Sequence, residues 1–126
     1  MEIQWFNENK QKASVTFYET NLTLNAIAKL LFESVEYVRV GRSKEGELLL
    51  CPVSYDDYYG GQVPKQECYP VVTHSSYGRI SSKSLLKQIA DSFGLKFTKD
   101  PLRVEAFSVD GEYLKIPLGQ LAEKGG

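Results

Sequence analysis

The sequence predicts one α+β domain made of two similar halves, each with a strand, a short helix and a two-stranded hairpin. Three observations lead to this prediction. The chain has 126 residues, 42% hydrophobic and 25% charged, which is ordinary for one globular domain. An apolar stripe with helical spacing precedes a hairpin pattern near the end of the chain. Residues 14–53 and 77–118 repeat the same order of patterns, residues 54–76 connect them, and residues 119–126 are expected as a flexible tail within the single domain 1–126.

The first half begins with residues 14–19, which are rich in β-branched and aromatic side chains and predict a strand. Asn25 is a favourable N-cap for a short helix that ends near residue 33. In that helix Ile27 and Leu30 would lie on one apolar face. The remaining residues, 36–53, predict two strands, and the continuous leucines of the second suggest that both of its faces are covered.

The second half repeats this order with clearer boundaries. Residues 77–80 predict a short strand, and either Ser81 or Ser82 caps the helix that follows. Gly94 is placed to end that helix in the left-handed conformation. The Asp-Gly pair at 110–111 lies between alternating apolar runs, which is a strong indication of a hairpin.

The connection 54–76 is rich in tyrosine, glycine and proline, and at most a short strand is expected in it, near residues 71–73. Its tyrosines have two open interpretations. They could anchor a protein partner, since tyrosine is enriched at interfaces, or they could pack the connection onto the domain. Packing is favoured because aromatic rings dominate burial wherever they fall. The tyrosines concerned are Tyr55, Tyr58, Tyr59 and Tyr69.

Two segments resemble a known family. Leu22-Thr-Leu24-Asn25 before the first helix and Tyr77-Gly78-Arg79-Ile80 before the second resemble the swapped-hairpin domains of AbrB-like and MazE-like proteins. Two such units in one chain are similar to the MraZ type. The resemblance implies a small β-barrel with two short outer helices. The family's usual proline is missing from both halves, and the Gly-Arg pair is missing from the first.

The same resemblance implies a DNA-binding regulator of transcription. Arg79 matches the family by motif position, whereas Lys83, Lys87 and Arg103 are candidates by charge alone. Residues 77–118 hold seven basic and five acidic side chains, but the whole chain has a net charge of −1, so bulk attraction to nucleic acid is not expected. The alternative for the two lysines, one helical turn apart, is an ordinary solvated helix face.

The second functional hypothesis is a non-enzymatic protein-interaction module that uses the tyrosine-rich segment 55–77. An enzyme is the weakest hypothesis. His74 is the only histidine, and its pairing with Cys68 would lack an identifiable third group. The cysteines do not form a metal-binding motif, so no catalytic residue, metal or cofactor is predicted.

The expected location is the cytoplasm, because the sequence has neither a secretory leader nor an apolar run long enough to span a membrane. Cys51 and Cys68 are then expected as reduced thiols. The expected partners are double-stranded DNA or another protein, with no membrane. The chain is expected to be a monomer with internal pseudo-symmetry or a homodimer.

Overall fold

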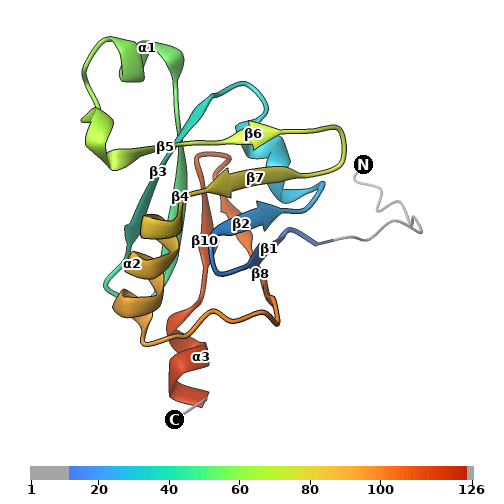
Figure 1. The fold of residues 1–126 in the computed structure, drawn as a ribbon. Helices are drawn as coiled ribbons and strands as arrows, with labels where there is room; N and C mark the ends of the chain where they lie inside the picture. Colours follow the sequence, from blue (N-terminus) through green and yellow to red (C-terminus); the bar gives the residue numbers. More distant parts are fainter. Residues whose placement is uncertain (1–11, 125–126) are drawn as a thin grey trace, which may run out of the picture.

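The computed structural model describes residues 12–124, whose arrangement is shown in Figure 1. Short strands dominate these residues, and helical segments lie between them. In chain order the elements are β1 (Ser14–Phe17), β2 (Asn21–Leu24), the 3-10 helix η1 (Ala28–Phe32), β3 (Tyr37–Arg42), β4 (Leu48–Val53), α1 (Tyr55–Tyr59), the 3-10 helix η2 (Lys65–Glu67), β5 (Cys68–Pro70), β6 (Val72–Thr73), β7 (Gly78–Ser81), α2 (Lys83–Phe93), β8 (Leu102–Glu105), β9 (Phe107–Val109), β10 (Tyr113–Ile116) and α3 (Gly119–Lys124).

The strands form two antiparallel sheets of five strands each. Sheet A has the order β6-β7-β2-β1-β8, and sheet B has the order β5-β3-β4-β10-β9. The predicted α+β barrel with two outer helices is therefore wrong, because the described residues are mostly β and form two sheets rather than a closed barrel. Among the helical segments only α2, with 11 residues, is longer than two turns. The other helical segments are too short to form stable helices without tertiary support.

The chain bends at two buried residues and passes from one sheet to the other. Val71 separates β5 from β6, and Ala106 separates β8 from β9. The backbone N–H of Val71 donates to the carbonyl of Glu36, and that of Ala106 donates to the carbonyl of Ala13, each at 2.9 Å. These bonds satisfy buried backbone groups at positions where the regular pairing is interrupted. The single strand predicted around Ala106 is thus divided between the two sheets.

Each half contains a hairpin, a helix and a second hairpin, so the predicted order β-α-β-β is wrong at its start. The first half opens with the β1–β2 hairpin and the second with the β6–β7 hairpin. Corresponding strands then meet at the sheet centres, where β2 pairs with β7 and β4 pairs with β10. The sequence did not predict the first hairpin because its turn, Tyr18-Glu19-Thr20, contains neither glycine nor proline. A hydrogen bond from the Tyr18 N–H to the Asn21 carbonyl, at 2.8 Å, closes this turn.

The hydrophobic core lies between the sheets and includes side chains from both halves. Strand residues alternate between this core and solvent, as they do when one face of a sheet is buried. The largest fully buried side chains are Phe17, Phe32, Leu22, Leu24, Leu48, Leu50, Ile80, Leu86, Leu114, Ile116, Leu118 and Val15.

The first predicted helix is shorter than expected and has a different buried face. The Asn25 carboxamide accepts hydrogen bonds from the N–H groups of Ala28 at 2.9 Å and Ser14 at 3.1 Å. The segment then forms the 3-10 helix η1, in which Ala28 is buried. Ile27 and Leu30, expected on the apolar face, are 38% and 57% exposed. A 3-10 helix rotates its side chains by a different angle per residue than an α-helix, so the predicted stripe does not face the core.

The second helix and the last hairpin confirm their predictions. Ser82 caps α2 by accepting the Leu85 N–H at 3.2 Å, and Gly94 ends the helix with a left-handed φ of 65°. Asp110 and Gly111 both have positive φ in the turn between β9 and β10, as a tight hairpin turn requires. Each of these features is specified by residues that are near one another in the sequence. The connection 54–76 contains α1, η2, β5 and β6, and α3 begins where a flexible tail was expected.

Candidate functional site

A row of polar side chains crosses the outer face of sheet A. In the strand register Arg79 of β7 lies opposite Thr23 of β2, Thr23 lies opposite Thr16 of β1, and Thr16 lies opposite Arg103 of β8. Directly cross-strand residues point to the same face of a sheet. Their apolar chain neighbours point inward, so these four side chains face solvent as one line, which we call the Arg-Thr row.

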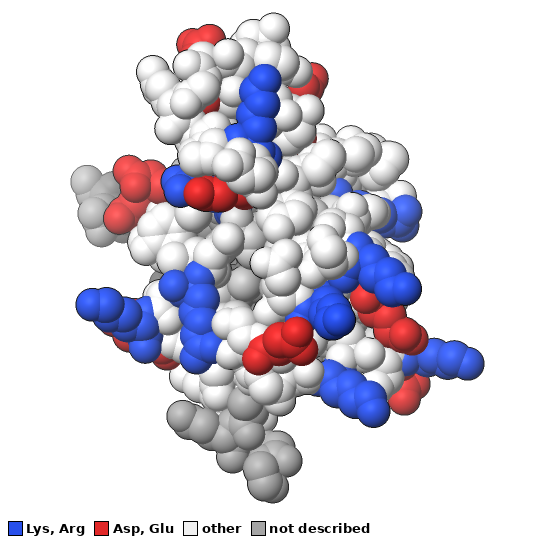
Figure 2. All heavy atoms as spheres, turned by 60° about the vertical axis from the view of Figure 1, so that its left-hand side comes forward, with Lys and Arg blue, Asp and Glu red and all other residues white. Residues whose placement is uncertain are grey.

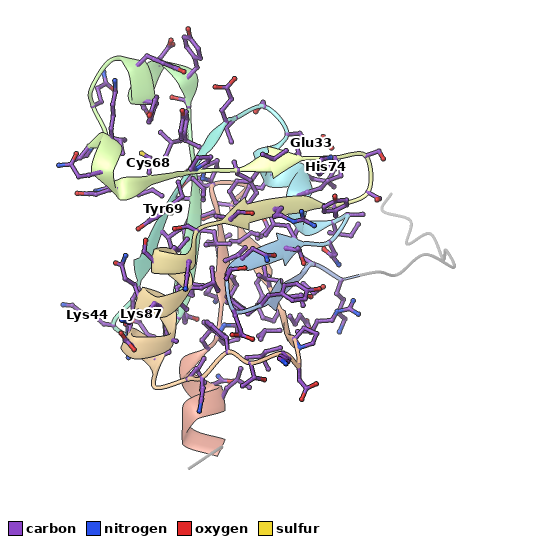
Figure 3. All side chains as sticks on the ribbon, in the orientation of Figure 1. Glu33, Lys44, Cys68, Tyr69, His74 and Lys87 are labelled. Carbon is purple, nitrogen blue, oxygen red and sulfur yellow. The ribbon has the colours of Figure 1, made fainter. Side chains whose placement is uncertain are left out.

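Arg79 forms one end of the Arg-Thr row beside a pair of aromatic rings. Its guanidinium carbon lies 5.5 Å from the centre of the Tyr77 ring. The His74 ring stacks on Tyr77 with a centroid distance of 4.6 Å. Figure 3 shows His74 at the turn between β6 and β7, at the edge of the sheet. The aromatic pair supports the exposed Arg79 side chain from one side.

Arg103 forms the other end of the row and is oriented by Ser14. Its Nε donates to the Ser14 Oγ at 3.2 Å. Ser14 is 7% exposed and donates its own N–H to Asn25, so it is a fixed support. The nearest acidic group on β8, Glu105, is paired with Lys12 at 3.9 Å. Among the described residues Arg103 forms no ion pair, although Arg103 and Glu105 line one hollow together with Lys12.

The surface between the two arginines is hollowed, and no carboxylate of residues 12–124 lines this hollow. An open hollow of about 340 Å³ is lined by Thr16, Thr23, Tyr77 and both arginines, among others. The outward side chains of β7, β2 and β1 are Arg79, Ser81, Asn21, Thr23, Ser14 and Thr16. This face therefore offers hydrogen-bond donors and two positive charges, with one carboxylate, Glu105 of β8, next to Arg103 at its edge.

The other two predicted nucleic-acid contacts lie elsewhere. Lys83 and Lys87 are exposed on α2 and line a separate hollow of about 360 Å³ that also includes Lys96 and Glu19. Figure 3 shows Lys87 on the outer side of α2, away from the turn that holds His74. The sequence therefore grouped four basic residues that the fold divides into two pairs.

The face in Figure 2 bears basic side chains that are separated by neutral surface and by acidic side chains. No continuous positive surface extends over this view. Such a surface would have favoured DNA over a protein partner. On the face seen in this view, the basic side chains therefore form local groups rather than a broad basic stripe.

The predicted tyrosines also divide into two groups. Tyr58 stacks on Tyr37 of β3 at a centroid distance of 3.7 Å, and Tyr59 meets Tyr58 edge-on at 4.9 Å. Tyr55 and Tyr59 are 67% and 51% exposed. Tyr69 of β5, in contrast, is half-buried against the core, and its hydroxyl accepts a hydrogen bond from Gln88 at 3.5 Å. The structure thus separates Tyr69, a packing residue, from a cluster around α1.

Tyr37 has a direct effect on the titration of Tyr58. A hydrogen bond with the Tyr37 side chain is the main cause that raises the pKa of Tyr58 from 10.0 to about 12, and partial desolvation adds to it. The ring stack attaches α1 to sheet B.

Cys68 and His74 do not form a catalytic dyad. Cys68 begins β5 and its thiol donates to the Pro64 carbonyl at 3.5 Å, whereas His74 follows β6 and stacks on Tyr77. Figure 3 shows Cys68 and His74 at separate places along the part of the chain that runs from β5 to the turn after β6. Burial raises the pKa of the Cys68 thiol, and the nearby Arg39 only partly offsets that effect. Within residues 12–124 there is also no cluster of three or more His, Cys, Asp or Glu side chains that could hold a metal ion.

No family model, curated protein or solved structure matches this chain. The resemblance to AbrB-like and MazE-like domains therefore stays a prediction. In the part of the chain that the structure describes, no helix has the length and apolar character needed to cross a membrane.

Proposed function

We propose that this protein binds DNA through the outer face of sheet A, as a cytoplasmic regulator of the kind that the AbrB-like resemblance implies. The observation that supports this proposal is the strand register, which aligns Arg79, Thr23, Thr16 and Arg103 across four neighbouring strands. The row ends in two guanidinium groups and has two hydroxyl groups between them.

The chemistry of the row suits a phosphate backbone. Arginine presents a planar fork of donors that matches phosphate, and threonine hydroxyls donate readily to phosphate oxygens. Adjacent strands are about 4.8 Å apart, so the three steps from Arg79 to Arg103 span roughly 14 Å. This span allows each arginine to contact a different phosphate. Phosphate contacts position a protein on DNA, whereas base contacts would supply sequence specificity.

Lys83 and Lys87 provide a matched control for this proposal. They have the same total charge as the two arginines but lie in another hollow, together with Glu19. If the Arg-Thr row binds DNA, removing the arginine charges has a larger effect than removing the lysine charges. If only net charge matters, the two changes have equal effects.

The test is a titration of mixed-sequence duplex DNA at several salt concentrations. We expect the Arg79→Gln and Arg103→Gln double variant to bind DNA more weakly. The slope of log K against log salt concentration should also be shallower by about 1.8, because each lost phosphate contact contributes about 0.9. Lys83→Gln with Lys87→Gln should change the slope by less than half as much. Equal changes in the two double variants, or no binding by the unmodified protein at low salt, would contradict the proposal.

A further inference from the structure

The helix α1 and its surroundings form a separate exposed feature at the end of sheet B. Figure 1 shows α1 at the top of the view, beyond the strands of both sheets. None of the residues of α1 is buried. We use the name α1 tip for the tyrosines and acidic residues gathered here, which are Glu36, Tyr37, Tyr55, Asp56, Asp57, Tyr58 and Tyr59.

The rings of the α1 tip form a continuous aromatic surface. Tyr37 and Tyr58 provide a stacked base, Tyr59 stands edge-on to Tyr58, and Tyr55 lies 4.4 Å from Tyr59 between ring centres. Tyr55 and Tyr59 are one helical turn apart and are the most exposed tyrosine or phenylalanine side chains among the described residues. Half-exposed aromatic rings held by other rings are typical of binding surfaces.

A cation already lies on this surface. The Lys65 ammonium is 5.4 Å from the centre of the Tyr58 ring and 6.0 Å from that of the Tyr59 ring. Both distances fall within the range of cation–π attraction. Lys65 belongs to the exposed 3-10 helix η2, so a stronger cation from another molecule could take its place.

The charge of the α1 tip also favours a cation. Asp56 and Asp57 occupy the first turn of α1. The pKa of Tyr59 is raised by desolvation first, then by Tyr37, and then by the nearby Glu36 carboxylate. The next acidic residue, Glu67, is already paired with Arg39. The α1 tip therefore holds three carboxylates, and the one cation lying on its rings is Lys65, which makes the surface acidic as well as aromatic.

We propose that the α1 tip binds an arginine-rich segment of a protein partner. Guanidinium planes stack on Tyr55 and Tyr59, and the charges are neutralised by Asp56 and Asp57. Arginine suits this surface better than lysine because its flat, weakly hydrated group stacks on aromatic faces while it donates to carboxylates. Nucleic acid does not suit it, since the carboxylates repel phosphate. This surface is separate from the Arg-Thr row, so the two proposals can fail independently.

The test uses a fluorescently labelled peptide of alternating arginine and glycine, with fluorescence anisotropy as the readout. We expect the full chain to bind this peptide more tightly than the matched lysine peptide, and not to bind the matched glutamate peptide. In the Tyr55→Ala and Tyr59→Ala double variant, the loss of two exposed cation–π contacts should weaken binding roughly 5- to 25-fold. Both side chains are exposed, so the fold should persist.

Two further variants make the outcome decisive. Phe107→Ala removes another exposed aromatic ring with a lysine above it, on β9 in a different part of sheet B, and should leave binding unchanged. Asp56→Asn with Asp57→Asn keeps the rings but removes two charges, so it should weaken binding and reduce its salt dependence. The proposal is overturned if the arginine peptide does not bind, or if the double tyrosine variant binds it as well as the unmodified chain does.

A second copy of the chain is the competing occupant, because the Arg-Thr row of one copy could meet the α1 tip of another. Light scattering over a range of protein concentrations separates the two cases. A monomer that still binds the arginine peptide supports the proposal. An oligomer that dissociates in the double tyrosine variant would instead assign the α1 tip to self-association and overturn it.

Discussion

The Arg-Thr row and the α1 tip are both exposed, but they are assembled in opposite ways. The row combines the β1–β2 hairpin, which holds Thr16 and Thr23, with two strands far along the sequence, which hold Arg79 and Arg103. The α1 tip takes most of its side chains from five consecutive residues, 55–59. The row is therefore supported by the whole of sheet A, whereas the tip depends on one short helix and its contact with Tyr37.

Their charges differ in sign as well. The row has two arginines and no carboxylate, and the α1 tip has three carboxylates beside one lysine. A chain with a net charge of −1 can thus present a cationic and an acidic surface at the same time. Net charge alone would have excluded neither a phosphate nor a cationic peptide as a ligand.

The largest expected effect follows from the support beneath the row. Phe17 follows Thr16 in β1, is fully buried, and stacks on Phe97 at 5.2 Å. Phe17→Ala should lower the free energy of unfolding by about 3–5 kcal/mol in a chemical denaturation experiment. Tyr55→Ala, in the exposed α1 tip, should change it by no more than about 0.5 kcal/mol. Similar losses in the two variants would mean that the tip is as much a part of the folded core as β1 is.

The same contrast explains what the sequence could predict. The helix α2 and the turn at Asp110 were predicted correctly because a cap, a stripe and a turn pair are local patterns. Arg79 and Arg103 were chosen separately, by motif position and by charge. Their alignment depends on the register of β1 with β8 and of β2 with β7, which joins residues up to 91 positions apart. No local pattern specifies that register.

The threonines of the row were missed for the same reason. Thr16 and Thr23 occupy ordinary outward positions of a hairpin whose turn has no typical turn residues. Strict alternation of polar and apolar residues in 14–17 and 21–24 would have assigned them to the outer face. Lys83 and Lys87 were placed on the correct helix, but the position of that helix relative to sheet A depends on packing.

The next prediction concerns the contact that holds the α1 tip. The pKa of Tyr58 is raised from 10.0 to about 12, so folding favours its protonated form. This contribution to stability is fully present below pH 10 and is lost as the pH rises towards 12. Tyr37→Phe removes the hydrogen-bonding hydroxyl and should bring the Tyr58 pKa back towards 10, measured by NMR of the tyrosine ring carbons.

Tyr55→Phe is the matched control, because it removes a hydroxyl from the same cluster without touching the Tyr37 contact. It should leave the Tyr58 titration largely unchanged. If Tyr58 titrates near 10 in the unmodified protein, the Tyr37 hydroxyl does not stabilise its protonated form, and the ring stack alone attaches α1 to sheet B.

The smallest expected effect compares two serines with the same local role. Ser54 caps α1 by accepting the Asp57 N–H at 3.1 Å, and Ser82 caps α2 by accepting the Leu85 N–H at 3.2 Å. Replacing either serine by alanine should cost about 1 kcal/mol locally. Because α2 buries an apolar face and α1 buries none, Ser82→Ala should lower the global free energy of unfolding. Ser54→Ala should instead speed hydrogen exchange at the Asp57 amide alone. A global loss in Ser54→Ala would show that the α1 tip unfolds together with the core, and that its rings are a structural part of the domain rather than a separate surface.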